Sequence, residues 1–312
     1  MIGSFGQFDS AGFAKAQAYW YKSQWLLRIP NARGGKPFRT NSSLVHIVES
    51  WEAPTQFGAV SGSRKNITVY SDAAAVELLL NGQSLGTRKL PIQPPGGDGG
   101  LDGAVQTWAQ WDDITWAPGN ITALAKDGGG NVVATASRRT CGEAARVVLS
   151  LDVPSASTGT GTALVLDGQD TAFVRASIVD STGNVVHHAS NMITFAVLSG
   201  PGKLVGAHNG KNSQHGRNDR PQVAAYHGLA RGVVSVTSVA ARSERERHLL
   251  RTIDVDADVE GMDGKHEQSV IVVTADSPGL VGGRVEIPLS TDLGHDGVLA
   301  VAAAGAGLPV AF

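Results

Sequence analysis

Two glutamates, Glu49 and Glu52, stand three residues apart in the stretch VESWE. Paired carboxylates can act as general acid and general base when both reach the same reacting group. On an extended strand, however, residues three apart point to opposite faces. The spacing therefore favours solvated or inter-domain polar contacts over a catalytic pair.

Other catalytic and metal motifs are missing from the sequence. It contains no Gly-x-Ser-x-Gly elbow, no His-Glu-x-x-His pair and no Walker phosphate loop. Cys141 is the sole cysteine, which excludes an internal disulfide and is expected to exclude any cysteine-based zinc site. His187, His188, His208 and His215 fit no regular ligand spacing and are expected at the surface or in turns. The sequence thus predicts no metal ligand, and no base near Cys141 in the chain that would activate its thiol.

An acidic stretch approximates the calcium loop D-x-[DN]-x-[DN]-G-x5-E through Asp256, Asp258, Glu260 and Glu267. Glu260 departs from that pattern, and the residues after Glu267 are typical of a strand rather than of the outgoing helix. A solvated acidic loop is therefore favoured, and calcium binding remains the alternative. No cofactor is predicted.

All six tryptophans lie within the first 116 residues. Their flat faces can stack on sugar rings, which makes Trp108, Trp111 and Trp116 candidates for carbohydrate contact. Trp108 and Trp116 would share one face of a strand if no bulge intervenes, and Trp111 would face the other way. Packing in a core is the more usual role of tryptophan in β-sandwiches, so both interpretations stay open.

Composition excludes several partners. The 312 residues carry a formal charge of −2, whereas a nucleic-acid partner requires a basic face. No apolar run approaches the roughly 20 residues of a membrane-spanning helix, so no membrane partner is expected. The N-terminal residues MIGSFGQFDS have neither the basic start nor the apolar centre of a signal peptide.

The elements that must position these residues are mostly strands. Only the segment from Lys15 to Leu27 has apolar residues at helical spacing, and Gly34, Gly35 and Pro37 end it. A single helix of this length is marginal in water, so it must dock on another part of a protein.

From Leu44 onward the hydrophobic period is two, with strand-like runs joined by Gly, Asn and Ser turns. Asn81-Gly82 is a strong hairpin signal. The Pro/Gly-rich residues 91–103 read as a long loop, and the charged residues 241–252 could be helical. The pattern predicts two successive units, each of the size of a sandwich.

These units resemble the C-terminal part of glycoside hydrolase family 2, of the β-galactosidase-like kind. The first resembles the fourth domain of that family through VHIVESWEAP (45–54) and ITVYSDAAAVELLLNGQSLG (67–86). The second resembles the fifth domain through LDGQDTAFVRASIVDSTGNVV (166–186), ITFAVLSGPGKLVGAHNG (193–210), AAYHGLARGVVSVTS (224–238) and VVTADSPGL (272–280). The stretch FDSAGFAKAQAYWYKSQW (8–25) resembles the end of the catalytic (β/α)8 barrel.

The resemblance implies a mainly β fold: tandem immunoglobulin-like β-sandwiches preceded by a short helical remnant of a TIM barrel. The expected units are 1–40 (end of the barrel), 41–144 (first sandwich), 145–289 (second sandwich, with an insertion at about 241–266) and a tail at 290–312.

In function, the resemblance implies an accessory region of a retaining glycosidase. The two catalytic glutamates of the family belong to earlier barrel strands, so no catalytic residue is expected here and the chain alone is expected to be inactive. Carbohydrate would then be bound through the missing barrel, and the sandwiches would buttress it and could take part in homo-oligomer contacts. A stand-alone carbohydrate-binding or adhesion module is the alternative.

Overall fold

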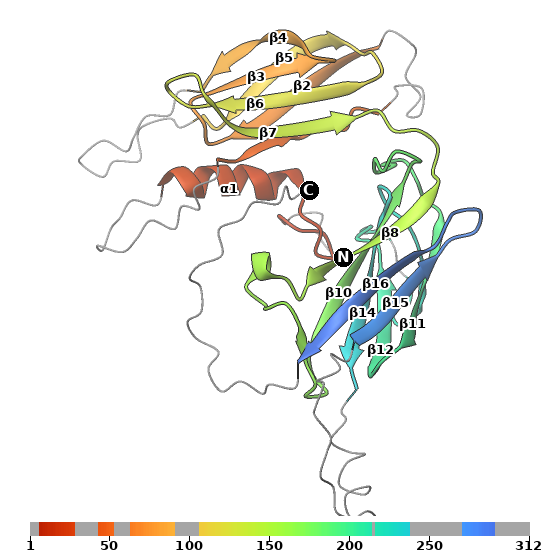
Figure 1. Ribbon diagram of the computed structural model, residues 1–312. Helices are drawn as coiled ribbons and strands as arrows, with labels where there is room; N and C mark the ends of the chain where they lie inside the picture. Colours follow the sequence, from red (N-terminus) through yellow and green to blue (C-terminus); the bar gives the residue numbers. More distant parts are fainter. Residues whose placement is uncertain are drawn as a thin grey trace, which may run out of the picture.

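A computed structural model of the protein describes residues 6–28, 43–52, 63–90, 106–213, 216–237 and 270–290. Two β-sandwiches follow each other along the chain (Figure 1). The first lies at the top of the view, with the helix α1 directly beneath it, and the second lies below. The fold is thus mainly β, as the sequence predicts.

The helix α1 comprises Ala16–Arg28, close to the expected range. The strands of the first sandwich are β1 Val45–Ile47, β2 Arg64–Ser71, β3 Ala75–Leu80, β4 Gln83–Lys89, β5 Trp108–Thr115, β6 Asn120–Lys126 and β7 Val132–Arg139. Those of the second are β8 Arg146–Val153, β9 Leu164–Val165, β10 Thr171–Val179, β11 Met192–Ser199, β12 Gly202–His208, β13 Gln222–Ala224, β14 Leu229–Val236, β15 Val270–Asp276 and β16 Gly283–Ser290. A short 3-10 helix, Ala156–Thr158, follows β8.

In the first sandwich a sheet of order β1-β2-β5 faces a sheet of order β4-β3-β6-β7. Alternate residues of each strand point into the space between the sheets, so β6 reads half-buried, buried, half-buried along its length. The core includes Ile67, Val69, Leu78, Ile121 and Trp51, all nearly inaccessible to solvent. Hydrophobic burial on this alternating pattern is what holds the two sheets together.

Two turns of the first sandwich follow directly from the sequence. Asn81 and Gly82 both have positive φ, 51° and 84°, and they join β3 to β4 in the two-residue hairpin that Asn-Gly predicts. The sequence Ser71-Asp72-Ala73-Ala74 also forms a turn, but β2 and β3 on either side of it belong to different sheets. This turn therefore carries the chain across the sandwich rather than forming a hairpin.

In the second sandwich a sheet of order β12-β14-β10-β8 faces one of order β13-β11-β15-β16-β9. Among the described residues, its strand pairings are antiparallel except the short one between β16 and β9, and a single parallel bridge joins Arg146 to Val281. Phe195 on β11 fills the centre of the core, and a Cβ on Gly232 would lie 2.8 Å from its ring. Gly232 thus has no side chain because the Phe195 ring occupies that space.

Several sequence predictions fall outside the described residues. These are the Pro/Gly-rich residues 91–103, the charged and acidic residues 241–267 and most of the tail at 290–312. Among the described residues, no helix combines the length and the hydrophobicity needed to span a bilayer.

Phe195→Ala is expected to lower the free energy of unfolding of the second sandwich by about 3–5 kcal/mol, because it leaves a cavity in a packed core. The matched control is Leu198→Ala on the same strand, where the side chain is 67% exposed; it should change stability by less than about 0.5 kcal/mol. Urea denaturation followed by far-ultraviolet circular dichroism measures both. Equal effects of the two variants would contradict the assignment of the core face of β11.

Candidate functional site at the junction of the two sandwiches

The residues before α1 form a tight loop. The Asp9 carboxylate accepts hydrogen bonds from the backbone N–H groups of Ala11 and Phe13, both at 2.9 Å, and Phe8 pairs with Ala14 as an antiparallel bridge. The carboxylate also lies against Gly210 of the second sandwich, where a Cβ would come within 2.1 Å of it. These hydrogen bonds fix the conformation of the loop, and the Asp9 carboxylate packs against the second sandwich.

Phe13 attaches this loop to β14. Its side chain is buried, and the Arg231 guanidinium lies 4.4 Å from the centre of the ring. The same guanidinium donates a hydrogen bond to the backbone carbonyl of Ala11. A desolvated cation on an aromatic face contributes about 2 kcal/mol, so this contact fixes the loop on the second sandwich.

Two further charged side chains, Arg175 and Asp152, interact with Arg231. Arg231 on β14 lies directly opposite Arg175 on β10 in the sheet register, an arrangement of like charges that is unfavourable by itself. Asp152 on β8 resolves it, because its carboxylate pairs with both guanidinium groups, at 2.9 Å for Arg175. The Asp152 side chain is only 18% exposed, so these charges interact more strongly than a surface pair would.

The helix α1 packs on the first sandwich. The Tyr19 ring stacks on the His46 ring of β1 with centroids 3.6 Å apart and planes at 4°. Ser23 is fully buried, and its hydroxyl lies 2.8 Å from the Thr107 hydroxyl, to which Gln24 also donates at 2.6 Å. The N-terminal residues 8–24 therefore contact both sandwiches: the loop touches the second and the helix touches the first.

A cleft of about 1500 Å³ runs along this segment between the sandwiches. Aromatic and cationic side chains are prominent in its lining, among them Tyr19, His46, Arg138, Lys211 and Tyr226. Burial and the nearby Arg138 charge lower the pKa of His46 to about 3, so this imidazole is neutral at pH 7. Burial likewise lowers the pKa of His187, another lining residue.

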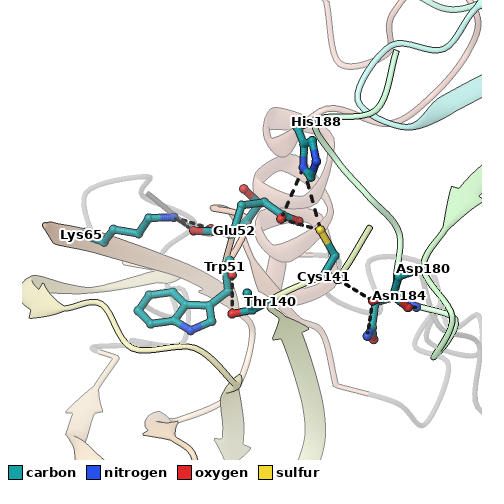
Figure 2. Close-up of polar contacts among 10 residues, drawn as sticks. Trp51, Glu52, Lys65, Thr140, Cys141, Asp180, Asn184 and His188 are labelled. Atoms are coloured by element: carbon teal, nitrogen blue, oxygen red, sulfur yellow. Dashed lines mark hydrogen bonds and ion pairs between the residues drawn. The ribbon is translucent and has the colours of Figure 1, made fainter. Parts of the chain in front are cut away.

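Where the chain crosses between the sandwiches, Glu52, Cys141 and His188 come together (Figure 2). The Cys141 Sγ atom lies 2.7 Å from Oε2 of Glu52 and 3.9 Å from Nδ1 of His188, and that Nδ1 lies 3.8 Å from the same carboxylate oxygen. Burial, and then the contact with Glu52, raise the pKa of the Cys141 thiol to about 12. In this arrangement the thiol donates a hydrogen bond to the carboxylate.

Neighbouring contacts hold this cluster in place. The Thr140 hydroxyl donates to the Trp51 carbonyl at 3.0 Å, and Gly142 N–H donates to Asp180 at 2.8 Å. Burial by itself would raise the pKa of Asp180, but hydrogen bonds from Gly142, Thr182 and Asn184 outweigh it and lower that pKa well below its usual range. Residues on both sides of Cys141 are thus fixed, one to each sandwich.

The three candidate tryptophans do not form a common surface. Trp108 is 40% exposed, Trp111 is 3% exposed and packed in the core, and Trp116 is half-buried against the same core. Trp108 and Trp111 face opposite ways, as expected. Trp116 does not share the face of Trp108, because β5 carries a bulge at Asp113, where φ is 62°. Among the tryptophans whose side chains the structure describes, Trp108 alone is exposed.

Other candidates have separate roles. Glu49 does not share a contact with Glu52; it accepts a hydrogen bond from Thr68 N–H at 2.7 Å. His208 accepts a hydrogen bond from Gly210 N–H at 3.0 Å, which fits a histidine in a turn. His215 and the acidic residues Asp256, Asp258, Glu260 and Glu267 lie outside the described residues, so the calcium alternative stays a prediction.

Sequence reasoning missed Phe13, Asp152, Arg175 and Arg231. A signal was present, because Asp152, Arg175 and Arg231 each interrupt an apolar strand pattern. Charges in such positions are seldom buried unless they are paired. The sequence does not show, however, that the three strands concerned are neighbours in one sheet.

Two family models match the chain. One is the glycoside hydrolase family 2 C-terminal domain 5, over residues 158–243, and the other is a domain of unknown function (DUF4982), over residues 62–134. The matches fall on the second and the first sandwich respectively.

Similar proteins agree with these matches. The β-galactosidase BoGH2A of Bacteroides ovatus is 28% identical over 207 residues, which are 66% of this chain and 19% of that protein. A putative β-glucuronidase of Formosa agariphila is 34% identical over 84 residues, 27% of this chain and 6% of that protein. The crystal structure of a β-glycosidase from Bacteroides vulgatus superposes with a TM-score of 0.65 at 20% identity, covering 92% of this chain and 28% of that one. The chain thus spans less than a third of the length of each of these proteins.

Asp152→Asn is expected to lower the free energy of unfolding by about 3 kcal/mol, because it leaves two opposed arginines without their shared carboxylate. Hydrogen exchange of the Ala11 and Phe13 amides should accelerate as the loop detaches. Glu286→Gln is the matched control, since its pair with Arg284 is largely exposed; it should cost less than about 0.5 kcal/mol. Unchanged exchange in Asp152→Asn would show that the loop is held by other contacts.

Stability is expected to fall as pH decreases from 6.5 towards 3. His46 is neutral in the folded state over that range, whereas the unfolded chain takes up the proton near the ordinary pKa of 6.5. The unfolded state then binds more protons, which favours unfolding. Urea denaturation between pH 7 and pH 4 should show a steeper loss for the native chain than for His46→Phe, which keeps a stacking ring. An equal loss of stability with falling pH in the native chain and in His46→Phe would contradict the assignment of His46 as a buried, neutral imidazole.

Proposed function

We propose that the chain is the accessory β-sandwich region of a retaining glycosidase of glycoside hydrolase family 2. The match of residues 158–243 to the C-terminal domain 5 of that family and the similarity to the B. ovatus β-galactosidase support this proposal. In this proposal its role is to hold the end of the catalytic barrel in a fixed position. The reaction of the whole enzyme would be hydrolysis of β-linked glycosides, with β-galactosides as the first candidates because the B. ovatus relative is named a β-galactosidase.

One observation carries the proposal: the N-terminal segment contacts both sandwiches (Figure 1). Through the Phe13–Arg231 contact and the Tyr19–His46 stack, the loop and helix resembling the end of a barrel are fixed at two separate points. A barrel continuous with this segment would be held in a defined orientation. Such a support function requires no carboxylate pair in the sandwiches themselves.

Exposed aromatic rings beside the segment agree with this role. Phe8 is 57% exposed and Tyr21 is 37% exposed, although both side chains are largely apolar. Packing against the rest of a barrel would remove them from water. Carbohydrate would then reach the enzyme through the barrel, while the sandwiches would shape the approach or provide contacts between copies.

The carbohydrate-binding alternative has less support. A sugar-binding platform usually needs more than one ring in a plane, whereas the described tryptophans offer Trp108 alone at the surface. Trp51 and Trp111 lie in the core of the first sandwich, and Trp116 packs against it.

The purified 312-residue chain is expected to show no hydrolysis of an aryl β-galactoside or an aryl β-glucuronide above the rate without protein. The reason is geometric: Glu49 and Glu52 contact different partners and do not face one reacting group. Release of the chromophore measures this, with the intact B. ovatus enzyme as positive control. Turnover that co-purifies with the chain would overturn the accessory role.

A chimera tests the supporting role directly. The upstream part of the B. ovatus β-galactosidase, joined to this chain at the loop before α1, is expected to resist thermal inactivation better than the upstream part alone. The same chimera with Asp152→Asn should lose that advantage, and the chimera with Glu286→Gln should keep it. Equal inactivation with and without the sandwiches would contradict the proposal.

A further inference from the structure

We propose that Glu52, Cys141 and His188 form a binding site for one zinc ion at the junction of the two sandwiches (Figure 2). The ligand atoms would be Oε2 of Glu52, Sγ of Cys141 and Nδ1 of His188. This site is separate from the accessory role proposed above and does not depend on it. The proposal departs from the sequence-based expectation that a single cysteine excludes any cysteine-based zinc site, because a site with mixed ligands needs only one cysteine.

The distances are close to those of a tetrahedral site. For zinc bonds of about 2.0–2.3 Å, neighbouring ligand atoms should lie about 3.3–3.6 Å apart. The observed separations from His188 Nδ1 are 3.8 Å to the carboxylate oxygen and 3.9 Å to the sulfur. The sulfur–oxygen separation of 2.7 Å would have to increase by less than an ångström, which rotation of the Cys141 side chain can supply.

An unpartnered buried oxygen points independently to a ligand. Glu52 is 0% exposed, and its Oε1 has no hydrogen-bond partner among the described residues. Lys65, the nearby lysine, donates instead to the backbone carbonyls of Ser50 and Glu52, at 3.3 Å and 2.9 Å. A carboxylate withdrawn from water in this way is costly unless a cation compensates it.

The ligand types favour zinc over other common cations. A thiolate with an imidazole and a carboxylate is a donor set for zinc, whereas calcium and magnesium prefer oxygen ligands alone. Binding would displace the thiol proton to solvent, so the net charge of the filled site would be that of one divalent cation, one thiolate and one carboxylate: zero. A neutral filled site suits a buried position.

The ligands also come from three parts of the fold. Glu52 follows β1 of the first sandwich, Cys141 lies in the connection between β7 and β8, and His188 lies between β10 and β11 of the second sandwich. A bound ion would therefore link the two sandwiches. Its expected effect is to stabilise their relative orientation.

The test uses the full chain and two metals. After dialysis against a chelator, the chain is titrated with Zn²⁺, and bound metal is measured by elemental analysis. Co²⁺ then serves as a spectroscopic substitute, because a thiolate ligand produces a charge-transfer band in the near ultraviolet. The chain has one cysteine, so this band can arise from Cys141 alone.

The expected result is one zinc per chain, a cobalt–thiolate band and a rise in melting temperature with zinc. Cys141→Ser should abolish the band, and Glu52→Gln and His188→Gln should each weaken zinc binding by at least about tenfold. His187→Gln, next to the site but outside it, is the matched control and should bind like the native chain. If folding of a variant is impaired, the band and metal content of the native chain still decide.

Two results would overturn the proposal. One is a native chain that shows no cobalt–thiolate band and no zinc-dependent rise in melting temperature. The other is zinc binding that Cys141→Ser leaves unchanged, which would place the metal elsewhere. In either case the cluster would be a hydrogen-bonded thiol and carboxylate with a structural role only.

Discussion

The contact of Phe13 and the Ala11 carbonyl with Arg231 is the interaction on which the arrangement of this chain depends. It joins the loop at residues 8–14 to the second sandwich. The helix α1 begins three residues after Phe13 and packs on the first sandwich. A helix is stiff, so fixing the loop directly before it on one sandwich and its face on the other constrains both. Arg231 can act in this way because Asp152 compensates its charge and that of Arg175.

The polar character of the junction is a consequence of this arrangement. Each sandwich is closed by its own apolar core, and the surfaces that meet between them carry histidine, arginine, glutamate and cysteine side chains. Buried polar groups require partners, and most of them have one here. The Asp180 hydrogen bond with Gly142 N–H and the Arg231–Asp152 pair are examples. Glu52 Oε1 is an exception among the described residues, which is why it draws attention as a ligand.

This arrangement agrees with the proposed accessory role better than with a carbohydrate-binding platform. The strands supply rigid cores, while the chemically distinctive side chains gather at the junction and along the N-terminal segment. A region that orients another domain needs rigidity and defined attachment points, and the two sandwiches provide both. If the chain supports a catalytic barrel as proposed, this rigidity would matter, because a retaining glycosidase requires its carboxylates at a fixed separation.

Much of the fold could be predicted from local sequence. The period-two strands, the helix near residues 16–28 and the Asn81-Gly82 hairpin all follow from rules that involve residues close together in the chain. The side of the sheet on which Trp116 lies could not be predicted from local sequence, because it depends on a bulge. The bulge at Asp113 that reverses it depends on pairing with β2, across a separation of 47 residues for the Asp113–Asn66 hydrogen bond.

The sequence by itself therefore determined the mainly β class, the element types and the family resemblance, because each rests on local pattern or on the order of motifs. The tertiary structure alone decided which polar residues meet. Glu52 and Cys141 are 89 positions apart, Cys141 and His188 are 47 apart, and Ala11 and Arg231 are 220 apart. Such contacts depend on how the completed sheets pack against one another, and the spacing of these residues along the chain does not predict them.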